Sequence, residues 1–333
     1  MEKTENLFPA DPSVLSDRSA IVKTTYKGEF WKPCPGTTKG YWCCGYQILT
    51  PSTGCGMYCR YCILQAYFPY QCQVMYENFH DMEKEVKEKM ASTKMDVIRF
   101  GTGEFGDSLY SENYMGVACK TAELLRPYKN VILELKTKSN NIEPLKKIRS
   151  PQQVIIGFSM NTPEMIRIME ENTASLEQRL EAARKCEEMG FFVAFHFDPM
   201  FVYDGWESEY REVVKRILDT VRDYRKIAWV SMGGFRTMPR LKQILKEKNS
   251  HLPLFSGELI YGEDGKLRYF RPLRVDMYKA MDDEFRICSS EIPLYMCMES
   301  PEIWKESKMI SRIPNGLPKY LDNRAKVMLN ISQ

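Results

Sequence analysis

The sequence predicts an α/β fold built on parallel strands, and three observations lead to this prediction. Short apolar runs recur along the chain, amphipathic stretches separate them, and no internal repeat interrupts the alternation. Strand, helix and strand repeated six or seven times imply parallel strands with right-handed crossovers, in either an open sheet or a barrel. The expected strands are Tyr46–Leu49, Val97–Phe100, Val131–Leu135, Val154–Phe158, Phe192–Phe197, Ala228–Met232 and Leu294–Cys297.

The clearest expected helix runs from Leu176 to Met189. Ser175 and Gln178 form a capping box at its start, and Leu176, Leu180 and Ala183 fall on one face. Gly190 ends it, because glycine readily adopts the left-handed conformation that closes a helix.

Two regions depart from the alternation. Residues 1–44 are rich in Pro, Gly and Lys and are expected to be an irregular wrap around a core formed by residues 45–250. Residues 251–333 are expected to complete the same domain. Within them, Gly257–Arg271 predicts two strands joined by the turn Gly262–Gly265, a β-hairpin.

Composition narrows the class of protein. The 333 residues are 44% hydrophobic and 27% charged with a net charge of +3, which is typical of a globular protein without an overall field for nucleic acid. The charged segment Met1–Asn6 does not resemble a signal peptide, and no run of about 18 apolar residues occurs. A cytoplasmic location is therefore expected. Eleven cysteines then indicate metal ligands, reactive thiols or buried thiols rather than disulfides.

Three of these cysteines follow the first expected strand directly. Cys55, Cys59 and Cys62 have C-x3-C-x2-C spacing, and thiolates so spaced can bind three corners of a [4Fe–4S] cluster. The fourth iron stays open, as a chelating substrate or cofactor requires. A structural zinc site is the alternative, but zinc sites usually combine two half-sites, and no second half-site lies nearby.

The cysteine loop resembles that of radical S-adenosylmethionine enzymes, in which this cofactor chelates the open iron and is cleaved to a 5′-deoxyadenosyl radical. Further segments are similar to the spore photoproduct lyase-like branch of these enzymes. The resemblance therefore implies a partial parallel (β/α)6-type barrel with a C-terminal hairpin region. The similar segments are Tyr46–Leu49, Cys62–Gln65, Lys136–Lys138, Phe158–Asn161, Leu176–Gly190 and Asp204–Glu207 with Tyr210.

The resemblance also implies roles for single residues. Tyr61 looks like the aromatic residue that contacts adenine, and Lys138 looks like the partner of the methionine carboxylate. The turn Gly101–Glu104 is similar to the one that receives the methionine amino group, with Gly103 allowing a close backbone approach and Glu104 or Asp107 as acceptors. Ser159 and Asn161 look like ribose contacts.

Two departures from the family pattern leave the substrate open. Spore photoproduct lyases of the best-known kind carry a hydrogen-donating cysteine just after the second strand, and residues 101–107 contain none. Ile63 stands where that family has a tyrosine. Another hydrogen donor is therefore needed, or the product radical has a different fate.

Among the other cysteines, Cys297 is the candidate hydrogen donor. It ends an expected strand, and if that strand is parallel its thiol opens toward the cluster; Glu299 is expected to keep it protonated. A buried strand-end cysteine is the alternative. Cys34, Cys43 and Cys44 precede a strand of about 20 Å and are expected at its far end, away from the cluster. A second metal site among them stays open, Cys119 and Cys186 are expected in the core, and Cys72 and Cys288 are not assigned.

Nucleic-acid binding is suggested by one segment. Lys266–Arg274 interleaves basic and aromatic residues, so that a strand there could neutralise phosphates and stack on bases. His196 and Asp198, at the end of the fifth expected strand, are possible substrate contacts, although such a histidine is more often structural.

The leading functional prediction is radical-initiated hydrogen abstraction from a nucleic-acid base or a nucleotide-like substrate, similar to DNA repair by a spore photoproduct lyase. The implied partners are S-adenosylmethionine and a low-potential electron donor of the flavodoxin or ferredoxin type. One alternative is a radical S-adenosylmethionine enzyme that modifies a small molecule or another macromolecule. The other is a non-enzymatic iron–sulfur or zinc protein.

Overall fold

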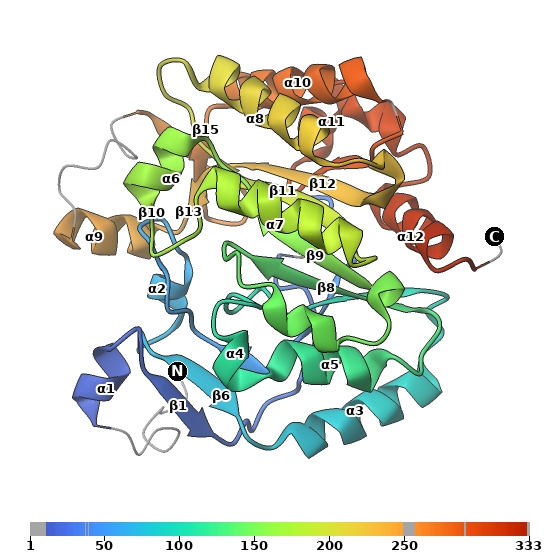
Figure 1. Ribbon diagram of the computed structural model, residues 1–333. Coiled ribbons are helices and arrows are strands. Elements are labelled where there is room, and N and C mark those ends of the chain that lie inside the picture. Colours follow the sequence, from blue (N-terminus) through green and yellow to red (C-terminus); the bar gives the residue numbers. More distant parts are fainter. Residues whose placement is uncertain (1–10, 37, 39, 249–256, 290, 332–333) are drawn as a thin grey trace.

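A computed structural model describes residues 11–331 apart from 37, 39, 249–256 and 290. Its centre is a curled eight-stranded sheet with the order β16-β12-β11-β9-β8-β7-β3-β2 (Figure 1). Among these described strands, seven run parallel to their neighbours, and the edge strand β2 is antiparallel to β3. The predicted partial parallel barrel is confirmed; it has seven parallel strands, whereas the family resemblance implied a (β/α)6-type barrel.

All seven expected strands are present in this sheet, with ends that differ by a few residues. The sheet strands are β2 Trp31–Pro33, β3 Gln47–Leu49, β7 Ile98–Gly101, β8 Val131–Thr137, β9 Val154–Ser159, β11 Phe192–Met200, β12 Ile227–Gly234 and β16 Leu294–Met296. Smaller sheets contain β1 Ile21–Thr24, β4 Ser52–Thr53, β5 Tyr58–Cys59, β6 Gln73–Tyr76, β10 Glu170–Glu171, β13 Arg236–Thr237, β14 Leu259–Tyr261 and β15 Leu267–Tyr269.

Helices cover the outer face of the sheet (Figure 1). The α-helices are α1 Pro12–Ser16, α2 Leu64–Tyr67, α3 Phe79–Ser92, α4 Glu112–Met115, α5 Val117–Leu125, α6 Pro163–Met169, α7 Leu176–Glu188, α8 Trp206–Thr220, α9 Pro239–Lys248, α10 Arg271–Cys288, α11 Pro301–Glu306 and α12 Leu317–Met328. Short 3₁₀ helices are η1 Glu143–Lys147, η2 Pro151–Gln153, η3 Tyr224–Lys226 and η5 Met309–Arg312. Within the described residues, no helix is both long and apolar enough to cross a membrane.

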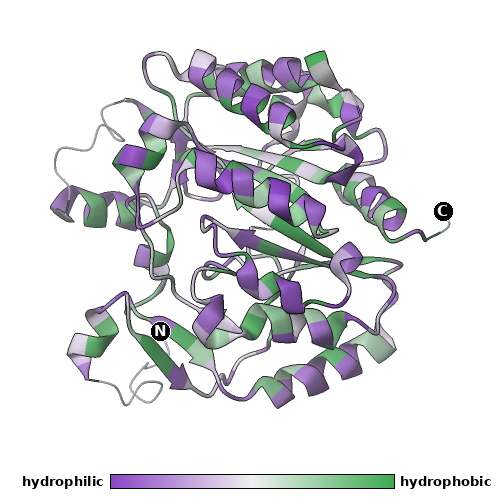
Figure 2. Ribbon diagram, in the orientation of Figure 1, coloured by the Kyte–Doolittle hydropathy of each residue, from purple (hydrophilic) through white to green (hydrophobic). Residues whose placement is uncertain are grey.

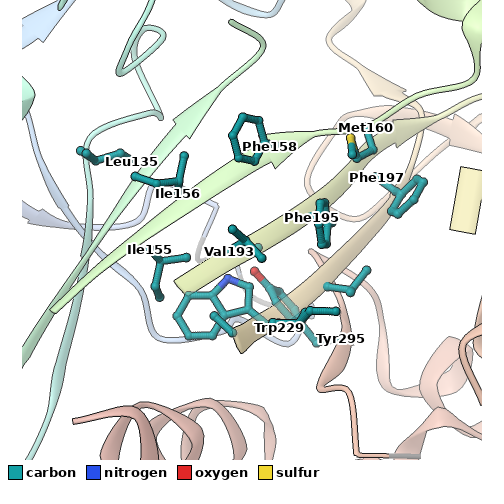
Figure 3. Close-up of a cluster of buried hydrophobic side chains, with 14 of the residues drawn as sticks. Leu135, Ile155, Ile156, Phe158, Met160, Val193, Phe195, Phe197, Trp229 and Tyr295 are labelled. Carbon is teal, nitrogen blue, oxygen red and sulfur yellow. The ribbon is translucent and has the colours of Figure 1, made fainter. Parts of the chain in front are cut away.

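The core lies on both faces of the central strands. Phe158 of β9 and Phe195 and Phe197 of β11 have no solvent exposure, and Figure 3 shows them beside Trp229 and Tyr295 from the next strands. Strands buried on both faces read as continuous apolar runs, which explains why the sequence pattern located them.

Helix α7 has the predicted cap. The hydroxyl of Ser175 accepts the N–H of Gln178, and the amide oxygen of Gln178 accepts the N–H of Ser175. Gly190 follows the helix with φ of +93°. Hydrophilic residues cover the outward side of α7 (Figure 2).

The two edges of the sheet are connected. Trp42 forms an isolated bridge with Glu299, and its N–H donates to the Glu299 carbonyl over 3.0 Å. The segment before β3 thus does not stay at the far end of that strand, where Cys34, Cys43 and Cys44 were expected. It crosses to the end of β16 instead. The region before residue 45 also contains regular structure, because β1 pairs parallel with β6 and β2 pairs with β3.

The predicted hairpin is present as β14 and β15, which pair antiparallel. Strand β13 adds a third strand through Arg236 and Thr237. The hairpin ends at Tyr269, because Arg271 with Pro272 already begins α10.

Candidate functional site

One cavity of about 340 Å³ opens at the carboxyl ends of the parallel strands. Residues at or near the carboxyl ends of five of these strands line it: Gly103, Lys138, Ser159, Asp198 and Cys297. Ligands of parallel α/β proteins bind at this edge of the sheet. The cavity is therefore the candidate site.

Cys55, Cys59 and Cys62 all line this cavity. Their loop is fixed by backbone contacts: Gly54 N–H donates to the Phe105 carbonyl, and Arg60 N–H donates to the Met169 carbonyl, each over 2.8 Å. Gly54 has φ of +79°, and a Cβ there would lie 2.3 Å from the carbonyl oxygen of Cys72. Glycine is thus required for the loop to fold over β6.

The chemistry of the three thiols suits an iron–sulfur cluster. Among the described residues, no group of three or more His, Cys, Asp or Glu side chains is arranged to hold a single metal ion. Burial raises the pKa of Cys55 to about 12, with a contribution from Asp107, and raises the pKa of Cys59 and Cys62. A polynuclear cation at the cavity would stabilise these soft thiolates. Three thiols of one loop on the wall of one cavity can therefore bind three corners of an iron–sulfur cluster.

Glu170 and Phe201 fix the position of the Tyr61 side chain. Its hydroxyl donates to the Glu170 carboxylate, and its ring lies 5.3 Å from the ring of Phe201. Glu170 also pairs with the fully buried Arg179 over 2.5 Å, and Arg179 donates to the Ser159 carbonyl over 2.8 Å. One buried ion pair thus connects the aromatic residue of the cysteine loop to the end of β9.

Glu170 and Arg179 were missed by the sequence analysis. A signal was present, because Arg179 falls between Leu176 and Leu180 on the apolar face of α7. A charged residue on a buried face requires a charged partner. The sequence did not reveal that the partner would be Glu170.

Lys138 lies beside the cysteine loop, with Nζ 5.8 Å from the centre of the Tyr61 ring. Burial lowers its pKa, but the charges of Cys59 and Glu170 outweigh burial and raise it. The ammonium group is thus favoured at the cavity wall. We call Cys55, Cys59, Cys62, Tyr61 and Lys138 the triad wall.

The two predicted acceptors near Gly103 already have partners. Glu104 pairs with Lys136 over 2.5 Å. Asp107 accepts the N–H groups of Leu109, Tyr110 and Lys138 and the hydroxyl of Thr137. Asp107 therefore orders the loop itself. Gly103 is held close to β8, since a Cβ there would lie 2.5 Å from the Cβ of Lys136.

The two predicted ribose contacts differ in position. Ser159 lines the cavity, but the described residues that line it do not include Asn161. The Asn161 amide oxygen accepts from the hydroxyl of Tyr210 over 2.7 Å, and its nitrogen donates to the Pro199 carbonyl over 3.3 Å. Asn161 thus serves to connect β9 with β11, and this position does not support a ribose contact.

Cys297 follows the parallel strand β16 and lines the cavity, as its sequence position suggested. The expectation for Glu299 is wrong, because its carboxylate is buried against Arg274 and Tyr278. Burial and the charge of Asp198 raise the pKa of Cys297 instead. After β16 the two side chains lie in different places: Cys297 lines the cavity, and Glu299 contacts Arg274 and Tyr278.

The expectation that Cys34, Cys43 and Cys44 lie far from the cluster is also wrong. All three line the same cavity as the triad. The Trp42–Glu299 bridge holds the segment with Cys43 and Cys44 beside the end of β16, and the N–H of Cys34 donates to the Tyr46 carbonyl over 2.9 Å. Gly36 N–H and Gly45 N–H donate to the sulfurs of Cys34 and Cys43, each over 3.4 Å. We call Cys34, Cys43, Cys44 and Cys297 the thiol wall.

The other cysteines with described side chains lie outside the cavity. Cys72 and Cys186 are fully buried, and the thiol of Cys119 donates to the Pro144 carbonyl over 3.3 Å. Cys119 and Cys186 thus occupy the core region in which they were expected.

His196 and Asp198 both line the cavity. His196 Nε2 lies 2.6 Å from Glu134 Oε1, which also accepts from Trp229 Nε1 over 3.0 Å. Asp198 pairs with Arg236 through both carboxylate oxygens, over 3.0 and 2.9 Å. His196 is therefore part of a buried polar network with one side at the cavity.

The segment Lys266–Arg274 does not form the exposed basic strand that was expected. Arg268 is buried and pairs with Asp264, and Arg274 is buried against Glu299. Arg271 pairs with Glu306 on the surface. The buried guanidinium groups of Arg268 and Arg274 thus neutralise carboxylates within the protein, since a buried charge requires a partner. Lys266 lines the cavity.

Comparison with known proteins identifies the family. A family model described as spore photoproduct lyase matches residues 43–249. A spore photoproduct lyase of Clostridium acetobutylicum is 28% identical over 63% of this chain and 62% of its own length. One of Bacillus subtilis is 23% identical over 50% of this chain and 49% of its own length. The chain thus spans about half to three-fifths of these relatives.

Solved structures show the same fold. A spore photoproduct lyase variant with bound AdoMet and dinucleoside spore photoproduct has a TM-score of 0.74 at 19% identity, covering 83% of this chain and 82% of its own. Another variant with dinucleoside spore photoproduct has a TM-score of 0.76 at 18% identity, covering 88% and 89%. Because the family model matches more than half of the chain, this protein belongs to the spore photoproduct lyase family.

Proposed function

We propose that this protein is a radical S-adenosylmethionine enzyme that abstracts hydrogen from a nucleic-acid base or a nucleotide-like substrate. One observation carries the proposal: three cysteines of one loop line the same cavity as Tyr61, Lys138 and Gly103. Membership of the spore photoproduct lyase family supports it. A structural neighbour that binds AdoMet and dinucleoside spore photoproduct adds further support.

Cys55, Cys59 and Cys62 would hold a [4Fe–4S] cluster with one open iron. When bound and reduced, the cluster supplies the electron that cleaves S-adenosylmethionine, and the chain itself binds and orients. Lys138 offers the ammonium group of a half-buried side chain to the methionine carboxylate. The Gly103–Glu104 turn offers its backbone to the amino group, and Ser159 offers a hydroxyl to the ribose.

Tyr61 would form the adenine platform. Rotation of its ring is restricted, because its hydroxyl donates a hydrogen bond to Glu170 and Glu170 forms an ion pair with Arg179. A ring fixed before binding loses little conformational freedom when the ligand arrives. The buried ion pair thus acts through Tyr61 and does not need to touch the cofactor.

Cys297 is the proposed hydrogen donor. Its thiol lines the cavity at the end of β16. Donation breaks the S–H bond, forms a C–H bond on the substrate radical and leaves the unpaired electron on sulfur. Residues 101–107 lack a cysteine, so a donor on another strand takes over that step.

The missing cysteine also favours a second candidate function. A radical enzyme that modifies a different small molecule or macromolecule would not need a donor after the second strand. The same cavity and cofactor residues would serve it, and only the substrate would differ.

The test combines cofactor cleavage with substrate choice. Anaerobically reconstituted protein with dithionite is expected to convert S-adenosylmethionine to 5′-deoxyadenosine, and dinucleoside spore photoproduct is expected to stimulate this conversion. Damaged DNA, RNA and metabolite fractions are tested in parallel. Stimulation by a metabolite fraction alone would support the second candidate, and a cluster-loaded protein that forms no 5′-deoxyadenosine would contradict both.

A further inference from the structure

Beside Cys297 lies an ion pair that the proposed reaction has not used. Asp198 of β11 and Arg236 of β13 meet through both oxygens and both terminal nitrogens, over 3.0 and 2.9 Å. Arg236 Nη2 also lies 3.7 Å from Cys297 Sγ, within hydrogen-bond distance of sulfur. All three side chains line the cavity.

The fold makes room for this arrangement. A Cβ on Gly233 would lie 2.7 Å from Arg236 Nη1 and 2.7 Å from Asp198 Oδ1. The ion pair therefore packs directly on the backbone of β12, which a larger residue would prevent. Cys297 is fixed from the same strand, since its N–H donates to the Met232 carbonyl over 2.7 Å. Both the pair and the thiol are thus held by β12.

The contact between Arg236 and Cys297 has a direction. A guanidinium group only donates, so sulfur must be the acceptor. The thiol hydrogen consequently cannot point at Arg236 and is left to point elsewhere, including into the cavity. A lone guanidinium would also favour the thiolate, which has no hydrogen atom to give. Asp198 cancels that charge.

We propose that Asp198 and Arg236 are positioning residues for Cys297: Arg236 orients the sulfur, and Asp198 neutralises Arg236 so that the thiol keeps its hydrogen. This inference rests on the proposed function, in which Cys297 gives that hydrogen to the substrate radical. Neither residue needs to contact the reacting atoms. This role explains why the Arg236 guanidinium lies within hydrogen-bond distance of the Cys297 sulfur.

The other groups around Cys297 do not replace this effect. Burial has the largest influence on the pKa of Cys297 and raises it. Asp198 raises this pKa further and Arg236 lowers it. Cys34, which raises it, and Lys136, which lowers it, have smaller influences. Cys44 and Tyr295 also lie within electrostatic reach. After burial, Asp198 and Arg236 have the largest opposing influences on the pKa of Cys297, so removing one of them is expected to shift that pKa.

The test measures the protonation of Cys297 directly. In cluster-loaded protein without S-adenosylmethionine, the alkylation rate of Cys297 by iodoacetamide is followed against pH by peptide mass spectrometry. Asp198→Asn leaves Arg236 unneutralised, so the midpoint of the rate is expected to fall by about one pH unit or more. Arg236→Gln is expected to keep the high midpoint, and Asp204→Asn, at an exposed aspartate, to match the wild type.

A second readout separates positioning from folding. In single turnover in D2O, the pH at which the product loses solvent deuterium is expected to be lower in Asp198→Asn than in the wild type. An unchanged alkylation midpoint in Asp198→Asn would overturn the inference. So would a raised KM for substrate in Arg236→Gln with no change in deuterium transfer, which would make the pair a substrate contact. A wild type that forms no 5′-deoxyadenosine would contradict the proposed function, while the alkylation result would still decide this inference.

Discussion

The triad wall and the thiol wall belong to one cavity but come from different parts of the chain. All five residues of the triad wall lie within the segment that matches the family model, residues 43–249. Cys34 and Cys297 of the thiol wall lie outside it, and both line the same cavity. The N–H of Cys34 donates to the Tyr46 carbonyl over 2.9 Å, and the N–H of Cys297 donates to the Met232 carbonyl over 2.7 Å. This difference leads us to predict that the residues for the cofactor are shared with the family, whereas Cys34 and Cys297 are particular to the part of the cavity outside the matched segment.

The largest effect is expected when a cluster ligand is removed from the triad wall. Cys59→Ala removes one of three cluster ligands, so we expect loss of the brown chromophore and of all S-adenosylmethionine cleavage. Iron analysis and 5′-deoxyadenosine measurement check this. Cys119→Ala, outside the cavity, is the matched control. A full-strength cluster in Cys59→Ala would mean that the triad is misassigned.

The next effect tests the support beneath the triad wall. Glu170→Ala leaves the fully buried Arg179 without its carboxylate. Breaking a buried ion pair costs about 3–5 kcal/mol, so the free energy of unfolding should fall by that amount in urea titrations. Glu171→Ala, an exposed neighbour, is the control. A loss below about 1 kcal/mol would show that the pair does not support the site.

A pH-dependent effect is expected at the buried network behind the cavity. Burial favours the neutral form of Glu134, but His196 and the hydrogen bonds outweigh it and lower the pKa of Glu134 to about 2. A lowered pKa stabilises the fold above the ordinary value of about 4.5, and this stability is lost as pH falls toward 2. The wild type should lose about 3 kcal/mol of stability in that window relative to Glu134→Gln. Parallel pH profiles of the two proteins would exclude this role.

The smallest expected effect is on cofactor affinity, and it tests whether Lys138 of the triad wall binds S-adenosylmethionine. Lys138→Ala removes a charge-assisted bond worth about 1.5–3 kcal/mol. Affinity for S-adenosylmethionine should therefore fall by roughly ten- to a hundred-fold with the cluster intact. Equilibrium binding measures it, with the exposed Lys147→Ala as control. Unchanged affinity would remove Lys138 from the site and leave Lys136 as the next candidate.

The two walls were not equally predictable. The strands and the cysteine loop carry local signals, because buried parallel strands are continuous apolar runs and three ligands of one loop are close in sequence. The triad wall could therefore be predicted from residues that stand together. Helix α7 and its cap were predictable for the same reason.

The thiol wall depends on a long-range contact. Cys43 and Cys297 are far apart in sequence, and contacts between distant segments, such as the Trp42–Glu299 bridge, place both beside one cavity. The partners of Glu299 and Arg268 were hidden in the same way, since a sequence pattern shows a charge but not its counter-charge. Asn161 shows the reverse error, because a family position suggested a ligand where the amide serves to join two strands.

The central claim is that Cys55, Cys59 and Cys62 hold a cluster with one iron open to S-adenosylmethionine. Electron paramagnetic resonance of the dithionite-reduced, reconstituted protein tests it most directly. We expect about four irons per chain in the triad cluster and a reduced [4Fe–4S] signal that changes shape when S-adenosylmethionine is added. A signal that is identical with and without S-adenosylmethionine, or a chain that binds zinc in place of iron, would contradict the account.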